Sequence, residues 1–528
     1  MSEGIVAAGH PLTAAAAREI LAAGGNAFDA IVAAHFAACV TEPVLASLGG
    51  GGFLLARTAA GEHHLYDFFT QTPRARRPRD EVDFRPILAD FGTATQEFHI
   101  GLGASACPGS VKGLFRIQRD LGRLPMRRLI EPAVALARRG VRLNTLQAYI
   151  FDIVGAIYTA DPAVQRLFAA RSDPGRLVRR GETVCQPLLA DTFEALAREG
   201  EGLFYRGEIG QRLADDCRER GGHLSRDDLR HYRVHRRRPL AIDYRGTRIH
   251  TNPAPSAGGM LIAFGLRLLE AGGPLPRPFG SAAQVARMAA VMAATSAARA
   301  EVERLSSPGR RSRKLLGADL LRRYRRTLAG RPLCQRGTTH VSILDAEGNA
   351  ASMTVSNGEG AGYAIPGTGI VLNNMLGEED LNPHGFHAWA RDTRMASMMA
   401  PTLLERSDGT GVVLGSGGSN RIRTAILQVL SNLVDFDMPV AAAIRKPRIH
   451  LENGHLSVEY GYPAESVAHL LEHYPEAQLW SGRNLFFGGV HAVMHRPRDG
   501  RLTGAGDPRR GGVCVRVASP CGEIVAKY

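Results

Sequence analysis

A hydroxyl residue that directly follows a glycine at the start of an apolar run is the feature of this sequence best suited to chemistry. Thr338 follows Gly337 and precedes the run Val341–Leu344. Its hydroxyl can attack the preceding carbonyl carbon, because Gly337 has no side chain to obstruct the approach. After such a cut Thr338 would be N-terminal, and its α-amine, with a reference pKa of about 8, could act as a base for its own hydroxyl. Such a junction is also an ordinary passage from loop to strand, so the rest of the chain must decide.

The elements that must position Thr338 lie on both sides of it. Helical patterns are predicted for Pro11–Ala23, Ala27–Val40, most of Gly109–Gly140, and Thr424–Val434. Short apolar runs predict strands at Thr339–Leu344, Ala350–Val355, Ile370–Leu372, Thr402–Leu404 and Gly411–Leu414. The first two flank the turn at Glu347–Asn349 and read as a hairpin. Strands and helices on both sides of one junction predict stacked sheets with outer helical layers.

A run of four glycines, Gly49–Gly52, directly precedes the apolar Phe53–Leu55. A phosphate cradle needs the opposite order, in which a strand is followed by glycines and then by a helix. The run therefore indicates close approach of backbones rather than nucleotide binding.

The composition is that of a globular enzyme. The chain has 528 residues, 44% of them hydrophobic, which is enough for a large core. Its seven cysteines are scattered and have no CxxC spacing, so we expect neither a disulfide framework nor a zinc site, and no other metal or cofactor. Met1–Pro11 has no basic segment leading into an apolar core, and Ala30–Val40 is too short to span a bilayer. We therefore expect a cytoplasmic protein without membrane contact.

The formal charge of +14 comes mainly from arginine. Clusters occur at Arg236–Arg238, Arg310–Lys314 and Arg322–Arg326, with few aromatic residues between them. We interpret them as solvated faces rather than as a nucleic-acid surface, and attraction of small anionic substrates stays open. The arginine-rich segment that leads to Gly337 is the best candidate for an exposed linker.

A series of short motifs runs through nearly the whole chain. They are Gly4–Val6, Gly24–Ala27, Gly49–Leu55, Pro108–Val111, Pro253–Gly259, Thr338–His340, Asp345–Asn349, Leu372–Asn374, Ala400–Thr402 and Gly415–Gly418. Together they resemble the γ-glutamyltransferase family of N-terminal nucleophile hydrolases. The resemblance implies an α+β fold, the four-layer αββα sandwich of that class, and a precursor cut between Gly337 and Thr338. Residues 1–337 and 338–528 would then be a large and a small chain that form one intertwined domain and stay together as a heterodimer.

The resemblance also implies roles for individual residues. Thr338 would be the nucleophile, with its new amine as the base, and the hydroxyl of Ser356 would orient it. Gly417 and Gly418 would form the oxyanion hole through their backbone N–H groups. The family's proline before these glycines is absent and one residue is inserted after them, so the donor pair could instead be Gly418 and Ser419.

The substrate pocket matches the family less well. Phe69 stands where the family has an arginine that grips the substrate carboxylate, and Phe69 cannot form that charged fork. Compensation could come from Arg74, Arg76 or Arg77. Ser397 is followed by Met398, where the family has a second serine.

The groups expected to bind the substrate amine match in part. Glu378, or Glu379 one register later, takes the place of the family's acidic residue, and Asn357 fits the asparagine role with a gap of one residue. The leading hypothesis is an autoprocessing enzyme that cleaves a γ-glutamyl, glutathione-type amide and passes the acyl group to water or an amine. The alternatives are an amidase or acylase with another acyl specificity, and an unprocessed, non-catalytic homologue.

Overall fold

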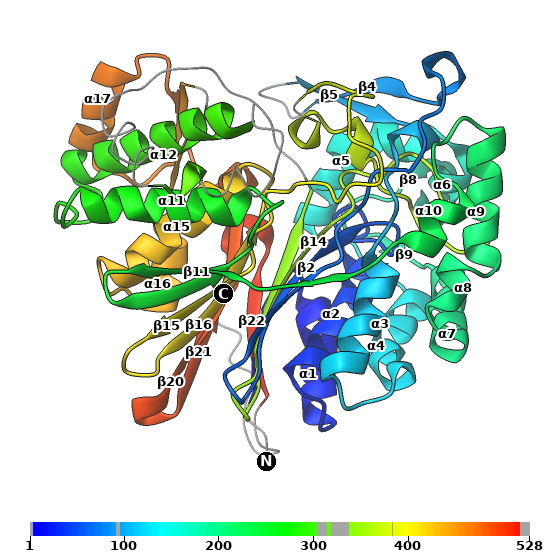
Figure 1. The fold of residues 1–528 in the computed structure, drawn as a ribbon, viewed down its shortest axis with the longest axis horizontal. Helices are drawn as coiled ribbons and strands as arrows, with labels where there is room; N and C mark the ends of the chain where they lie inside the picture. Colours follow the sequence, from blue (N-terminus) through cyan, green and yellow to red (C-terminus); the bar gives the residue numbers. More distant parts are fainter. Residues whose placement is uncertain are drawn as a thin grey trace.

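The computed structural model describes residues 4–90, 95–303, 314–317, 337–382, 384–452 and 454–517. Within these ranges a seven-stranded and a six-stranded antiparallel sheet face each other, and helices cover the outer face of each (Figure 1). The first sheet has the order β10-β3-β2-β14-β13-β1-β22. The second has the order β11-β12-β15-β16-β20-β21. This arrangement confirms the expected αββα sandwich.

The strands of the first sheet are β1 (Gly4–Ala8), β2 (Gly51–Arg57), β3 (His63–Asp67), β10 (His235–Arg237), β13 (Thr339–Leu344), β14 (Ala350–Ser356) and β22 (Val513–Val517). Those of the second are β11 (Leu240–Tyr244), β12 (Thr247–Thr251), β15 (Thr402–Arg406), β16 (Gly411–Gly417), β20 (Gly489–Arg496) and β21 (Arg501–Ala505). In the first sheet, the β13–β14 hairpin lies between β1 and β2, so strands from before and after Thr338 pair within one sheet.

Alternation along the strands divides the first sheet into two buried faces. Ile5 and Ala7 of β1 belong to the core cluster shared with the second sheet, whereas Val6 and Ala8 belong to the cluster under the outer helices. Successive side chains of a strand point to opposite faces, so a central strand covered on both sides is apolar throughout. The same alternation directs Thr339 toward the helices and His340 toward the second sheet.

The helices over the first sheet include α1 (Pro11–Ala22), α2 (Ala27–Thr41), α3 (Ser110–Leu121) and α4 (Met126–Arg139). All residues of α2 are buried, because it lies between the sheet and the neighbouring helices. Asn26 caps its N-terminus in a reciprocal capping box with Asp29. The helix ends at Thr41, and its C-cap residue Glu42 lies beside Thr339, the first residue of β13.

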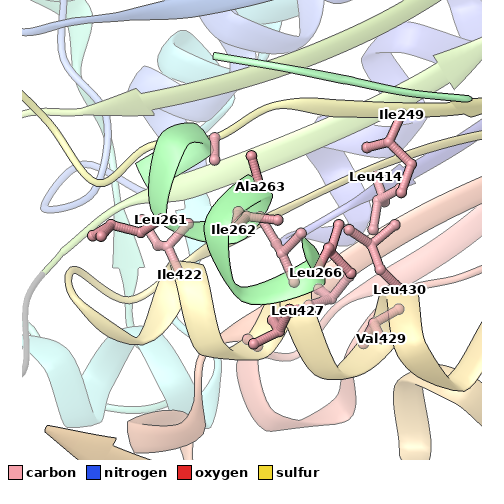
Figure 2. Close-up of a cluster of buried hydrophobic side chains, with 14 of the residues drawn as sticks. Ile249, Leu261, Ile262, Ala263, Leu266, Leu414, Ile422, Leu427, Val429 and Leu430 are labelled. Carbon is pink, nitrogen blue, oxygen red and sulfur yellow. The ribbon is translucent and has the colours of Figure 1, made fainter. Parts of the chain in front are cut away.

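The second helical layer contains α11 (Gly258–Ala271), α12 (Ala282–Glu303), α15 (Arg421–Val434) and α16 (Val440–Arg445). Figure 2 shows the packing of this layer, in which side chains of α11, such as Leu261 and Leu266, face side chains of α15, such as Ile422 and Leu427. Leu414 of β16 closes the cluster from the sheet side. This core fixes β16, and with it the glycines at the end of β16.

The remaining helices are α5 (Thr145–Thr159), α6 (Pro162–Leu167), α7 (Pro187–Glu199), α8 (Gly202–Tyr205), α9 (Glu208–Glu219), α10 (Arg226–His231) and α17 (Ala464–His473). The small sheets contain β4 (Arg85–Asp90), β5 (Thr95–Ile100), β6 (Val141–Arg142), β7 (Ala169–Ala170), β8 (Asp173–Leu177), β9 (Thr183–Val184), β17 (Ile449–Glu452), β18 (His455–Val458) and β19 (Gln478–Leu479). The 3-10 helices are η1 (Arg79–Glu81), η2 (Leu102–Ala104), η3 (Met375–Gly377), η4 (Glu379–Leu381), η5 (Leu485–Phe487), η6 (Pro497–Asp499) and η7 (Pro508–Arg510).

Several expectations from the sequence need correction. Ile370–Leu372 is not a strand, because this loop makes only isolated bridges to Gly49 and Ala364. The helix predicted to begin at Thr424 begins three residues earlier, at Arg421. Arg237 is not merely solvated, since its Nε donates to the buried carboxylate of Asp67 at 2.7 Å.

The expected hairpin and the first helices are confirmed. The arginine-rich linker falls almost entirely outside the described residues. In the part of the chain that the structure describes, no helix is both long enough and apolar enough to cross a membrane.

Candidate active site

Thr338 lies where β13 begins, between the ends of the two sheets. It is buried, and its carbonyl oxygen is pressed against Gly417 at the end of β16. A Cβ atom on Gly417 would lie 2.1 Å from that oxygen, so only glycine fits there. The glycine cluster singled out in the sequence therefore lies directly against the expected nucleophile.

Side chains hold both backbone polar groups of Gly337, whose carbonyl belongs to the peptide that joins it to Thr338. The Gly337 carbonyl oxygen accepts hydrogen bonds from Thr338 Oγ1 at 2.8 Å and from Ser356 Oγ at 2.7 Å. The Gly337 N–H donates to Glu359 Oε1 at 2.9 Å. Ser356 reaches this carbonyl because it is the last residue of β14, the antiparallel partner of β13. Two hydroxyls thus converge on the one carbonyl that a self-cleavage step would attack.

Glu42 lies on the opposite side of β13. Its carboxylate accepts hydrogen bonds from Thr339 Oγ1 at 2.8 Å and from Thr13 Oγ1 at 3.2 Å. Burial raises the pKa of Glu42 to about 7, although both hydroxyls and the charge of Arg510 act in the other direction. Glu42 therefore ties the end of α2 to the residue that follows Thr338.

The buried guanidinium of Arg510 contacts the backbone of Thr338. Its Nη1 donates to the carbonyl oxygen of Thr338 at 3.3 Å, and its Nη2 lies 3.2 Å from the position of a Cβ on Gly418. Burial lowers the pKa of Arg510 to about 10, which leaves the guanidinium charged at neutral pH. Sequence reasoning missed Arg510, Glu359 and Glu42. Of these, only Glu42 could have been found, because a carboxylate at the end of an apolar helix indicates a buried charged group.

The ring of His340 lies behind the site, on the face of the first sheet that meets Gly415 of the second. Its ring nitrogens pair with Thr354 Oγ1 at 2.8 Å and Ser342 Oγ at 2.9 Å. Burial, together with the nearby His491, lowers the pKa of His340 well below its usual value, so the ring is neutral. A Cβ on Gly415 would lie 2.3 Å from the ring, which explains the glycine on the facing strand.

Two of the predicted substrate residues are near Gly337. Asn357 follows Ser356 and is fully buried, and neither atom of its side-chain amide has a hydrogen-bond partner among the described residues. A Cβ atom on Gly358 would lie 2.3 Å from Glu378 Oε1, so Glu378 is next to Gly358. The carbonyl oxygen of Gly358 in turn would lie 2.9 Å from a Cβ atom on Gly337. The structure therefore places both residues in the neighbourhood of Gly337.

The two residues after Gly417 lie beyond the end of β16 and have positive φ angles. Gly418 has a φ of +121°, a conformation that favours glycine, and Ser419 has a φ of +50°. The Ser419 hydroxyl donates to Asp380 Oδ2 at 2.9 Å. Ser419 is thus engaged with the segment around η4, and its role as an alternative oxyanion donor stays a prediction.

Phe69 belongs to the core between the sheets. It is 1% exposed and stacks on Phe53, with ring centroids 5.6 Å apart. Its carbonyl accepts a hydrogen bond from the hydroxyl of Tyr232 at 2.7 Å and another from Arg394. Phe69 therefore stabilises the fold, and its side chain offers no cationic group for a carboxylate.

The three arginines that could compensate for Phe69 have other contacts. Arg74 pairs with Asp392 at 3.0 Å. Arg76 stacks on Trp389, and Arg77 donates to backbone carbonyls around Gly222. None of these contacts leads to Thr338.

Ser397 and Met398 line the start of α11 instead of presenting a pair of hydroxyls. Ser397 Oγ accepts a hydrogen bond from the Met399 N–H at 3.0 Å, and Met398 is buried in the core. The substrate role of Ser397 stays a prediction.

The chemistry that these groups can perform is nucleophilic attack on an amide carbonyl. The hydroxyls of Thr338 and Ser356 converge on the carbonyl of Gly337, and Gly417 adjoins the next carbonyl along the chain, that of Thr338. In the described part of the chain, the residues clustered closely enough to hold a metal ion are His63 with His250 and Glu405, and His469 with Glu472 and His473. Neither cluster includes a residue named above as a neighbour of Thr338.

Known proteins resemble this chain over its whole length. A family model described as Gamma-glutamyltranspeptidase matches residues 13–517. An "Acylase ACY 1 proenzyme" of Pseudomonas sp. (strain V22) is 31% identical and covers 100% of this chain and 96% of its own length. The "Glutathione hydrolase proenzyme" of Escherichia coli (strain K12) is 30% identical, over 96% of this chain and 90% of its own length.

Solved structures agree with these relatives. The crystal structure of a cephalosporin acylase from Bacillus halodurans has a TM-score of 0.83 and 25% identity, and the match covers 97% of this chain and 95% of that one. The Helicobacter pylori gamma-glutamyltranspeptidase structure has a TM-score of 0.52 and 25% identity, over 60% of this chain and 88% of that one. The family match, the full-length relatives and the shared fold lead to one conclusion: the chain belongs to the gamma-glutamyltranspeptidase family of enzymes.

Proposed function

We propose that this protein is made as a precursor, cuts itself between Gly337 and Thr338, and then uses Thr338 to cleave the amide bond of a small acyl compound. The observation that carries the proposal is the pair of hydroxyls on the Gly337 carbonyl, Thr338 Oγ1 at 2.8 Å and Ser356 Oγ at 2.7 Å. The relatives named as proenzymes support a cut of this kind.

The proposed cut is a transfer of the Gly337 acyl group from nitrogen to oxygen. Thr338 Oγ1 forms a bond to the Gly337 carbonyl carbon, and the C–N bond of the peptide breaks. The hydroxyl proton ends on the departing nitrogen, which becomes the α-amine of Thr338. Water then hydrolyses the resulting ester, which frees the Gly337 carboxyl group and restores the Thr338 hydroxyl. Ser356 donates to the oxygen that carries the negative charge of the intermediate.

In the mature enzyme the free α-amine of Thr338 acts as the base for the neighbouring hydroxyl. The hydroxyl attacks a substrate amide, the amine product leaves, and water or a second amine takes the acyl group. The first candidate for that group is γ-glutamyl, as in a glutathione-type substrate. The name of the Escherichia coli relative and the buried position of Glu378 near Gly337, where it can receive a substrate amine, support this choice.

A second candidate is an acylase whose acyl group lacks the carboxylate that the family's arginine would bind. Phe69 favours it, because this side chain is packed in the core and no arginine takes its place among the contacts described for Arg74, Arg76 and Arg77. The relatives named as acylases fit the same idea. Turnover of γ-glutamyl anilide and of neutral acyl anilides separates the two candidates: preference for the neutral group would retire the glutamyl assignment.

Denaturing electrophoresis and mass spectrometry test the cut itself. The wild type should give pieces that correspond to residues 1–337 and 338–528, and Thr338→Ala should give one intact chain. Thr159→Ala removes an exposed hydroxyl at the end of α5 and is a control that should cut normally. A purified wild type that stays in one piece would contradict the mechanism and favour the non-catalytic alternative.

A further inference from the structure

The exposed face of α17 carries a cluster of side chains whose nitrogen and oxygen atoms are of the kinds that bind metal ions. Its last turn contains His469, Glu472 and His473, and one ligand atom from each lies within 4.8 Å of the others. The helix is at the outer edge of the second helical layer, where it packs on α12 (Figure 1). The amide-cleavage site uses none of these residues.

The spacing of the two histidines places them on one face of the helix. Positions i and i+4 are neighbours on a helix surface, so both imidazoles can reach a common point outside the helix. Their ring centroids are 4.9 Å apart and their planes meet at 62°. Two imidazoles bound to one tetrahedral zinc ion at normal bond lengths have centroids about 5 Å apart. The observed separation of the ring centroids therefore matches that of a chelating pair.

The hydrogen-bond partners of the two rings select the tautomer that a metal requires. His473 Nδ1 lies 3.1 Å from the carbonyl oxygen of His469, and His469 Nδ1 lies 3.3 Å from Glu472 Oε2. A carbonyl and a carboxylate only accept, so each neutral ring carries its proton on Nδ1 and keeps the Nε2 lone pair. Metal-binding histidines in proteins are typically anchored in this way through the other ring nitrogen.

The other histidine cluster does not have these features. His63 and His250 stack with centroids 3.9 Å apart and planes only 12° from parallel, so the lone pairs of the two rings do not converge on one ion. Their shared partner Glu405 is also bound by Arg57 Nε at 2.7 Å, which places a positive charge beside it. This cluster is an internal ion pair between the sheets.

We infer that His469 and His473 form a two-imidazole site for a divalent transition-metal ion such as Zn²⁺, with Glu472 orienting the first ring and water completing the coordination. Imidazole suits zinc, copper and nickel, whereas calcium and magnesium prefer oxygen ligands. The bound ion would join residues one helical turn apart and stabilise the end of α17. This inference is independent of the proposed amide cleavage.

Calorimetric titration of the full, untagged protein with ZnCl₂ tests the inference. We expect saturable binding at this site in the wild type, and a loss of at least about tenfold in affinity for His469→Asn and for His473→Asn. Glu472→Ala should weaken binding by about tenfold or more, because it removes the partner that fixes the first ring. His455→Asn removes an exposed histidine from β18 and is the matched control, which should bind like the wild type.

Thermal unfolding with and without ZnCl₂ gives a second readout. Zinc should raise the melting temperature of the wild type and of His455→Asn, because a ligand that binds only the folded state stabilises it. It should not raise that of the variant that lacks both His469 and His473. Wild-type zinc affinity in that double variant, or a loss of binding on His250→Asn instead, would overturn the assignment. Self-cleavage should be unchanged in all α17 variants, so failure here does not bear on the proposed function.

Discussion

Removing the hydroxyl of Ser356 should slow self-cleavage far more than it affects folding. The Gly337 carbonyl accepts two hydroxyl hydrogen bonds, but the one from Thr338 disappears when that hydroxyl attacks and loses its proton. The hydroxyl of Ser356 is then the one that still donates a hydrogen bond to the developing oxyanion. Loss of one such donor costs about 10²–10³ in rate in a studied protease, or about 3–4 kcal/mol in the barrier. We therefore expect Ser356→Ala to cut at least about a hundredfold more slowly than the wild type.

A time course of precursor cleavage measures this effect. The precursor is made in a short cell-free synthesis, and its conversion is followed on denaturing gels, with the new N-terminus at Thr338 confirmed by mass spectrometry. Ser356→Thr keeps the hydroxyl and should recover most of the rate.

Ser352→Ala is the matched control for the loss of Ser356. Ser352 lies on the same face of β14, is equally enclosed, and donates to Leu414 of the second sheet. Its removal should lower stability but leave the cleavage rate of the folded precursor near that of the wild type. If Ser356→Ala cleaves as fast as Ser352→Ala, the hydroxyl of Ser356 does not stabilise the oxyanion and the reasoning fails.

The site makes three further predictions. Gly417→Ala should block self-cleavage, because its Cβ would lie 2.1 Å from the Thr338 carbonyl oxygen. The control is Gly411→Ala at the other end of β16, where the new atom meets nothing within 4 Å. This control should cleave normally on the same gels. Burial raises the pKa of Glu42 to about 7, so its stabilising contribution is full below about pH 4.5 and is lost as the pH rises through 7. Stability measured by urea unfolding should therefore decline between pH 5 and pH 8, and Glu42→Gln should remove about 2–3 kcal/mol of that decline. An unchanged pH slope in this variant would refute the shift. Phe69→Ala should lower the free energy of unfolding by about 3–5 kcal/mol, as expected for a buried aromatic ring, and a loss below 1 kcal/mol would show that Phe69 is not a core residue.

The sequence determined the fold and the position of the candidate nucleophile. The apolar patterns that predict α1, α2 and the β13–β14 hairpin are local, and local patterns survive in the folded chain because each side chain finds a buried face at the expected period. The rest of the topology was implied by the resemblance of the ordered motifs to a family with a known fold. The loop at Ile370–Leu372 was misjudged because a short apolar triplet does not show whether a neighbouring strand is available to pair with it.

Only the tertiary structure decided what surrounds Thr338. Glu42 contacts Thr339 across 297 residues of sequence, and Arg510 reaches the carbonyl of Thr338 across 172. Both contacts depend on how the sheets stack and how α2 docks on the first sheet, and no local pattern carries that information. The same holds for Phe69, whose identity suggested an altered substrate pocket but whose burial against Phe53 makes it part of the core. Sequence periodicity specifies which face of an element is buried, whereas the partner on the other side of that face is set by the packing of the whole domain.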